Sequence, residues 1–242
     1  MRRILMMILK NILHVPGMLA RLWKYAAKPD QYADEERHAF LRELDGYANR
    51  GGNVIIEGFG FENIPKENGF IFYPNHQGMY DVLALIAVCE KPFSVVAKKE
   101  VEKVPLLKSV FKVMKALFID REDVKQSLQI ILQVTKDVKE GKNYVIFPEG
   151  TRSKQGNIVG DFKGGSFKAA TKAKCPIVPV ALIDCFKPFD TKSTDPVSVQ
   201  VHILKPLLYE EYKDMKTVEI AEEVRKRIVE KIQEKCEKTV DN

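Results

Sequence analysis

From Asn53 onward, short apolar runs alternate with stretches of helical periodicity, and this alternation restricts the possible folds more than any other feature of the chain. A strand–helix order of this kind is typical of α/β proteins whose sheet is mostly parallel. We therefore predict an α/β fold with a mixed, largely parallel sheet flanked by helices. The predicted strands are 53–57, 70–73, 93–97, 116–119, 144–147, 177–183 and 197–204, and the predicted helices are 80–90, 106–115, 124–139, 165–173 and 218–235.

The first 50 residues carry a different pattern, in which apolar residues recur at helical spacing on both sides of Pro16 with Arg and Lys among them. A third, more polar helix is expected at 34–48, ended by Gly51 and Gly52. The apolar positions are Ile4, Leu5, Ile8, Leu9, Ile12, Leu13, Leu19, Leu22, Trp23 and Tyr25.

This apolar stretch has two interpretations. It either lies in a bilayer interface or packs on the rest of the protein, and the interspersed Trp, Lys and Arg favour the membrane. The run from Ile4 to Leu9 is too short to span a bilayer and Lys10 interrupts it, so neither a transmembrane helix nor a signal peptide is predicted. We predict that residues 1–50 form an N-terminal amphipathic helical arm that docks on a membrane, and that residues 51–242 form the α/β domain.

The net charge of +6 favours an anionic partner, which is a nucleic acid, an anionic membrane or a phosphorylated substrate. The chain has neither RNA-binding aromatic patterns nor zinc-finger spacing, which argues against nucleic acid. The four cysteines lie far apart and the four histidines lack paired ligand spacing. We therefore expect no disulfide framework, no metal site and a reducing cytoplasm as the compartment.

Polar residues gather after four of the predicted strands. The residues in question are 74–81 after the strand at 70–73, Lys98 and Lys99 after 93–97, Asp120 and Arg121 after 116–119, and 148–153 after 144–147. In open α/β sheets, ligands bind in the crevice outside the carboxyl ends of the strands. A base, an acid and several cations are therefore expected to meet there.

His76 and Asp81 have the chemistry of a base and its orienting carboxylate. They are five residues apart, so they cannot share one face of a regular helix, and we place His76 in a loop and Asp81 in the first helical turn. A carboxylate near a helix N-terminus is favoured as the anion and can hold one imidazole nitrogen. The other nitrogen is then free to take a proton from a substrate hydroxyl.

Four blocks of this sequence resemble the glycerolipid acyltransferase family. Asn75-His76 through Asp81 is similar to the family's NHxxxxD motif, and three further blocks follow in the expected order: Phe118–Arg121, Phe147–Ser153 and Ile177–Ala181. The bacterial 1-acylglycerol-3-phosphate acyltransferases are the branch that fits best, over about residues 70–182. Lys115 departs from the pattern, because family members often have Gly there.

The resemblance implies that His76 and Asp81 are catalytic and that no metal and no cofactor takes part. Arg152 and Arg121 are suited to charged hydrogen bonds with a phosphate, and backbone N–H groups near Gly150 and Thr151 add donors. The family implies that Glu149 also shapes this substrate site, although Glu149 is equally suited to pairing with Arg152.

The implied reaction moves a fatty acyl group from acyl-CoA or acyl-carrier protein to the sn-2 hydroxyl of 1-acylglycerol 3-phosphate, giving phosphatidic acid. Alternatives are glycerol 3-phosphate or another lysophospholipid as acceptor, or a catalytically silent lipid-binding protein. A lysolipid acceptor places the protein on the cytoplasmic face of the cell membrane, as a peripheral protein. Lysines 98, 99, 103, 108 and 112 suit either donor, or are a solvated face.

Overall fold

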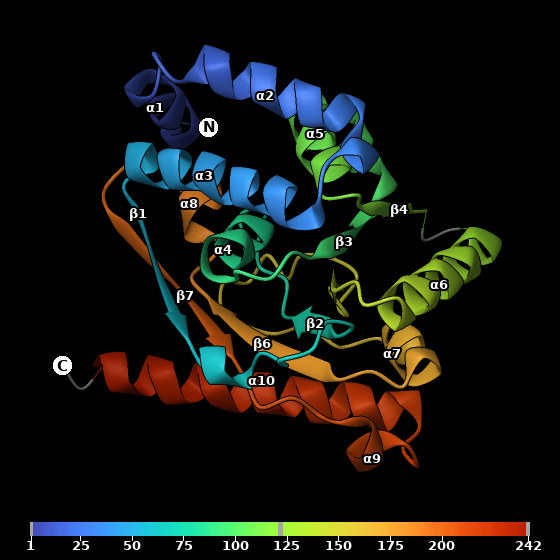
Figure 1. Ribbon diagram of the computed structural model, residues 1–242. Coiled ribbons are helices and arrows are strands. Elements are labelled where there is room, and N and C mark those ends of the chain that lie inside the picture. The colour runs from blue at the N-terminus through green and yellow to red at the C-terminus, as the bar shows by residue number, and fades with distance from the viewer. Residues whose placement is uncertain (1, 121–122, 241–242) are drawn as a thin grey trace.

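The computed structural model describes residues 2–120 and 123–240, which form a three-layer arrangement with a sheet between two groups of helices (Figure 1). The strand order is β1-β7-β6-β2-β5-β3-β4. Strands β6, β2, β5, β3 and β4 are parallel, whereas β7 is antiparallel to β6 and β1 is parallel to β7. The predicted mixed, largely parallel sheet is confirmed. The strands are β1 Val54–Phe59, β2 Ile71–Pro74, β3 Ser94–Lys98, β4 Leu117–Ile119, β5 Tyr144–Val145, β6 Ile177–Ile183 and β7 Val197–Ile203.

The helices divide between the two faces of the sheet. One face carries α1 Arg2–Lys10, α2 Val15–Ala27, α3 Asp34–Gly52, α4 Asp81–Val88, α5 Pro105–Val113 and α8 Lys187–Asp190. The other carries α6 Val124–Lys139, α7 Lys168–Ala173, α9 Tyr209–Tyr212 and α10 Thr217–Val240. Short 3₁₀ helices are η1 Pro29–Gln31, η2 Phe61–Asn63, η3 Lys99–Lys103 and η4 Gly164–Phe167.

Two hydrophobic clusters hold these layers together, one on each face of the sheet. Strand β2 and the residue before it illustrate the alternation, since Phe70 and Phe72 enter the cluster under α3 and α4, whereas Ile71 and Tyr73 enter the cluster under α10. Strand β6 is buried along its whole length. Burial on both faces explains why these strands read as continuous apolar runs in the sequence.

Helix α3 extends further than the sequence predicted. The predicted helix stops at residue 48 with the two glycines beyond it, whereas Gly51 and Gly52 are the last two residues of α3 and the left-handed residue that follows is Asn53, with φ of 53°. A Cβ atom at Gly51 would lie 2.4 Å from the Asn11 side chain, and one at Gly52 would lie 2.3 Å from Met7. The two glycines therefore let α1 approach α3 closely.

Helices α1 and α2 bury one side and expose the other. Met7, Leu22 and Tyr25 belong to the cluster that also contains residues of the sheet. On the outer side, Leu13 is 89% exposed and Trp23 is 59% exposed. The packing interpretation thus holds for the inner side of these helices. Membrane docking by the exposed side stays a prediction, and so does the division at residue 50.

Among the described residues, no single helix is long and apolar enough to cross a membrane, and α1 and α2 meet that criterion only as a pair bent by 103°.

Candidate active site

The polar segments predicted to converge start from one edge of the sheet. Strands β2, β5, β3 and β4 are parallel neighbours, so their carboxyl ends lie on the same side. Residues 74–81 leave β2 there and residues 146–153 follow β5, while Lys98 ends β3 and Asp120 follows β4. Arg121, which the sequence predicts as a phosphate ligand, lies outside the described residues.

His76 and Asp81 form a hydrogen-bonded pair at this edge. The distance between His76 Nδ1 and Asp81 Oδ2 is 2.6 Å. His76 lies in the loop after β2 and Asp81 is the first residue of α4, as the five-residue spacing predicts. The side chain of Asp81 is fully buried and that of His76 is 21% exposed. Since Nδ1 is engaged by the carboxylate, Nε2 is the nitrogen available for proton transfer.

The surroundings of Asp81 suit a carboxylate that only accepts hydrogen bonds. Gln77 N–H donates to Oδ2 at 2.7 Å, and Gly78 N–H donates to Oδ1 at 3.0 Å. Burial raises the pKa of Asp81, and the hydrogen bonds from His76, Gly78 and Gln77 oppose that rise. Each donor points at an oxygen, so Asp81 fixes the direction of the His76 ring as well as the turn that leads into α4.

Amide side chains next to His76 fix its loop to the neighbouring strand. Asn75 exchanges two hydrogen bonds with the backbone of Leu182, at 3.0 and 2.7 Å. Gln77 accepts from Cys185 N–H at 2.7 Å and donates to Asn157 Oδ1 at 2.7 Å. Sequence reasoning assigned no role to Gln77 or Asn157, and the only signal for Gln77 was its place beside the histidine.

Glu149 links the loop after β5 to the histidine loop. Glu149 is 4% exposed, with Oε1 accepting from His76 N–H at 2.7 Å and Oε2 accepting from Gly160 N–H at 3.1 Å. Burial raises the pKa of Glu149, and these two backbone hydrogen bonds oppose the rise. Glu149 thus has an internal role, with backbone partners in place of the Arg152 partner that the sequence suggested. Its contact with a substrate stays a prediction.

Three predicted phosphate ligands lie in the described segment after Glu149. Gly150 is in the left-handed region, with φ of 70°, and Thr151 is exposed. Arg152 is half-buried, and its guanidinium has no hydrogen bond or ion pair with another described residue. Lys163 is a further cation here, since its Nζ would lie 3.1 Å from a Cβ atom at Gly150. Lys163 is not among the residues that the sequence predicts to bind the substrate.

An apolar cavity of about 290 Å³ opens beside the histidine, between the sheet and α6. Gly150 and Lys163 form part of its wall. Phe147 lines the cavity and also packs on the His76 ring, with 4.3 Å between ring centroids. The remaining apolar lining includes Val96, Ile119, Ile130, Ile131, Val134 and Ile146. The pair of His76 and Asp81 therefore adjoins both a cationic segment and an apolar space.

Within the ranges 2–120 and 123–240, no three His, Cys, Asp or Glu side chains come together in a way that would hold a metal ion.

The fold and this site define an α/β protein with a histidine–carboxylate pair at the carboxyl edge of its sheet. A family model described as Acyltransferase matches residues 56–183, more than half of the chain. The chain therefore belongs to the acyltransferase family.

Two relatives and one solved structure show how far the similarity extends. The 1-acyl-sn-glycerol-3-phosphate acyltransferase of Borreliella burgdorferi is 35% identical over 132 residues, which are 54% of this chain and 52% of that protein. The protein of the same name from Saccharomyces cerevisiae is 31% identical over 179 residues, 72% of this chain and 59% of that protein. The chain thus spans about half the length of the curated relatives it matches.

The crystal structure of the 1-acyl-sn-glycerophosphate acyltransferase of Thermotoga maritima aligns with a TM-score of 0.72 and 23% identity, covering 96% of each chain. This likeness extends the shared fold to the N-terminal helices, because nearly the whole of both chains is included.

Proposed function

We propose that the protein transfers a fatty acyl group from a thioester, either acyl-CoA or acyl-carrier protein, to the sn-2 hydroxyl of 1-acylglycerol 3-phosphate. The product is phosphatidic acid. The observation that carries the proposal is the His76–Asp81 pair, which leaves Nε2 free beside an apolar cavity and a cationic loop. The names of the relatives from Borreliella burgdorferi and Saccharomyces cerevisiae support the same reaction.

The proposed chemistry needs only the pair itself for proton transfer. His76 Nε2 accepts the proton of the acceptor hydroxyl while Asp81 holds Nδ1, and the hydroxyl oxygen attacks the thioester carbonyl carbon. The new C–O bond forms as the C–S bond breaks, and the imidazolium returns its proton to the departing thiolate. No acyl-enzyme forms in this scheme, because the nucleophile belongs to the acceptor.

In this proposal the acceptor phosphate and an acyl chain bind to different parts of the site. The phosphate of the acceptor binds near Arg152, with Gly150, Thr151 and Lys163 close by and Arg121 as a further predicted ligand. An acyl chain enters the cavity of about 290 Å³, whose apolar wall excludes water from the thioester. The cavity shares Gly150 and Lys163 with the proposed phosphate site, so both groups bind near His76 and the hydroxyl and the carbonyl come together.

We further propose that the protein is peripheral and docks on the cytoplasmic face of the cell membrane through α1 and α2. Their outer side exposes a row of large apolar residues beside basic ones, which is the composition of an interfacial helix. The exposed apolar residues are Ile4, Leu5, Ile8, Leu9, Ile12, Leu13 and Trp23. Such docking brings the acceptor to the enzyme in the plane of the bilayer.

One experiment separates this function from its rivals. The purified protein is incubated with acyl-CoA or acyl-carrier protein and with 1-acylglycerol 3-phosphate, glycerol 3-phosphate or lysophospholipids that bear other head groups. We expect phosphatidic acid to form fastest. Faster acylation of glycerol 3-phosphate or another lysophospholipid would replace the proposed acceptor, and vesicle binding without turnover would indicate a silent lipid-binding protein.

A further inference from the structure

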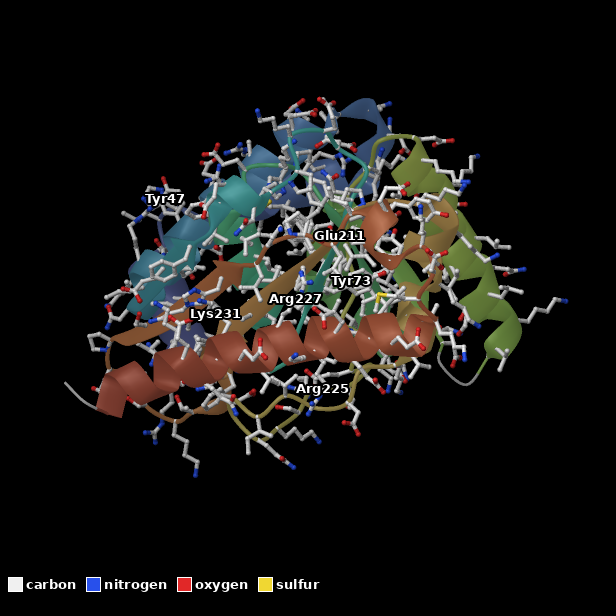
Figure 2. All side chains as sticks on the ribbon, turned by 90° about the horizontal axis from the view of Figure 1, so that it is seen from below. Tyr47, Tyr73, Glu211, Arg225, Arg227 and Lys231 are labelled. Atoms are coloured by element: carbon white, nitrogen blue, oxygen red, sulfur yellow. The ribbon has the colours of Figure 1, made fainter. Side chains whose placement is uncertain are left out.

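One arginine of helix α10 forms hydrogen bonds to the backbone of the loop at 151–163. Arg225 Nε donates to the Gly160 carbonyl at 2.8 Å, and Arg225 Nη2 donates to the Val159 carbonyl at 3.0 Å. The side chain of Val159 is buried in the cluster under α10. Figure 2 shows Arg225 on the side of α10 that faces this loop. Two adjacent carbonyls are therefore fixed by one rigid, planar donor group.

The same stretch of backbone reaches the proposed base in two further contacts. Gly160 N–H donates to Glu149 Oε2, and the other oxygen of Glu149 accepts from His76 N–H. A Cβ atom at Gly160 would lie 2.6 Å from Glu149 Oε2, so the absence of a side chain there leaves room for the carboxylate. A continuous series of contacts thus runs from Arg225 through Gly160 and Glu149 to the backbone of His76.

We propose that Arg225 is a positioning residue for His76, acting through Gly160 and the buried carboxylate of Glu149. The inference rests on the proposed function, because it assigns His76 as the base. Arg225 touches neither His76 nor Asp81; it fixes the loop that keeps Glu149 in place. Errors of about 1 Å in the placement of a catalytic group cost up to roughly a hundredfold in rate, so a change this far from the imidazole is measurable.

Arg227 provides a matched control on the same helix. It lies two residues further along α10, which is about 200° around the helix, and Figure 2 shows it on the opposite side from Arg225. Its Nε pairs with Glu223 at 2.7 Å, away from the proposed site. Arg225 and Arg227 have similarly exposed side chains, 38% and 29%. Arg225→Ala and Arg227→Ala therefore both remove an arginine from α10, but only Arg225→Ala removes the hydrogen bond to Gly160.

The kinetic test compares Arg225→Ala, Arg225→Lys and Arg227→Ala. We expect Arg225→Ala to lower kcat about tenfold with both KM values within about twofold, and Arg225→Lys to recover most of the loss because an ammonium also donates to carbonyls. Arg227→Ala should leave kcat within about twofold. Equal effects of the two alanine variants, or an unchanged kcat in Arg225→Ala, would overturn the proposal.

A second variant tests the route through Glu149. Gly160→Ala keeps Arg225 but places a methyl group against Glu149 Oε2, so it should lower kcat by a similar factor. The double variant Arg225→Ala/Gly160→Ala should lose little more than either single variant, because both act on the same carboxylate. Fully multiplicative losses would show that the two residues act independently and would overturn the route.

Hydrogen exchange gives a readout that does not depend on activity. The His76 N–H should exchange faster in Arg225→Ala and in Gly160→Ala than in the wild-type protein or Arg227→Ala, because its acceptor has moved. If the wild-type protein lacked acyltransferase activity, the proposed function would fail and this exchange pattern would still test the positioning. Unchanged protection of His76 N–H in both variants would contradict the inference.

Discussion

His76 is the residue on which the proposed chemistry depends most directly. His76→Ala should lower acyl transfer by at least about a hundredfold, the usual scale for removing a general base. Among the described residues, the His76 side chain hydrogen-bonds only to Asp81, and its ring packs at a tilt against Phe147, so the variant should remain folded. Steady-state kinetics with a thermal melt as control provides the measurement. Near-normal turnover in a folded variant would exclude His76 as the base.

Arg152 is the predicted phosphate-binding arginine that lies among the described residues. Arg152→Ala should raise the KM for the lysolipid more than the KM for the acyl donor, since a charged hydrogen bond worth about 1.5–3 kcal/mol is lost. The sequence predicts the same for Arg121→Ala. Kinetics with each substrate varied in turn measures the two effects. A rise confined to the donor KM would place the arginine at the thioester carrier instead.

Asp45 gives a prediction about stability and pH. This residue of α3 is 3% exposed, and burial raises its pKa to about 7 from the ordinary 3.8. One oxygen accepts from Asn49 at 2.9 Å, and the other has no partner among the described residues. The folded chain therefore keeps this proton to a higher pH than the unfolded chain does. The contribution of Asp45 to the free energy of unfolding must therefore decrease as the pH rises from 3.8 to about 7.

Asp45→Asn should remove this pH dependence, because an amide stays neutral. The variant should exceed the wild-type free energy of unfolding by up to about 4 kcal/mol at pH 8 and by much less at pH 4. Urea unfolding of both proteins at the two pH values measures the difference. Burial lowers the pKa of His202 to about 4, so the contribution of His202 to the free energy of unfolding rises with pH. The variant must therefore be compared with the wild-type protein at each pH. A variant less stable than wild type at pH 8 would refute the prediction.

The placement of His76 and Asp81 was predictable at this scale, whereas the contacts that support the pair were not. A spacing of five residues already places His76 in a loop and Asp81 at a helix start. The partners of Glu149 are two backbone N–H groups, one of them from a glycine, so no side-chain pattern in the sequence indicates these contacts. Arg225 lies 65 residues from Gly160, and only the folded chain reveals their contact.

At the scale of elements, Lys115 precedes β4 in a conformation that favours glycine. Its φ is 53°, which explains physically why a glycine suits this position. Its Nζ pairs with exposed Asp30 at 2.8 Å, a kind of surface contact that contributes little. Lys115→Gly should therefore be about 1 kcal/mol more stable than Lys115→Ala, although both lose the ion pair. Denaturant unfolding decides the order, and an alanine variant as stable as the glycine variant would contradict it.

Elements with a strong period or a continuous apolar run were predicted well, and errors fell where packing decides the boundary. Helix α6 has the predicted bounds, and β6 matches the predicted range 177–183. By contrast, α3 continues through Gly51 and Gly52 because α1 packs against them, and a pair of glycines alone does not distinguish a helix end from a close approach. The short helices α8 and α9 were missed, since four residues are too few to show a period.

At the scale of the whole molecule, the N-terminal helices form part of the hydrophobic core, in addition to their proposed role in membrane docking. Leu22, Tyr25 and Phe40 share one cluster with Phe72 and Val180 of the sheet. Arg3 donates to the carbonyls of Gly52 at the end of α3 and of Asp195 before β7. Removing residues 1–28 would expose this core, so a deletion cannot separate docking from stability. Substitutions on the exposed side are the appropriate test.

The combined variant Leu9→Glu, Leu13→Glu and Trp23→Ala should remain folded and sediment poorly with anionic vesicles. All three side chains are more than half exposed, so their loss removes little packing within the protein. In lipid they would bury apolar area, and each glutamate adds repulsion from the anionic surface. High salt should release the wild-type protein only in part, because it screens the charges and leaves the apolar contribution.

Leu208→Glu is the control, because Leu208 is also exposed and precedes α9, on the opposite side of the molecule from α1 and α2 (Figure 1). It adds negative charge without touching the proposed docking face, and it should sediment nearly as well as the wild-type protein. Co-sedimentation over a range of vesicle concentrations, with thermal melts of each variant, measures the effect. If the combined variant binds vesicles as strongly as the wild type, the outer side of α1 and α2 is not the docking surface.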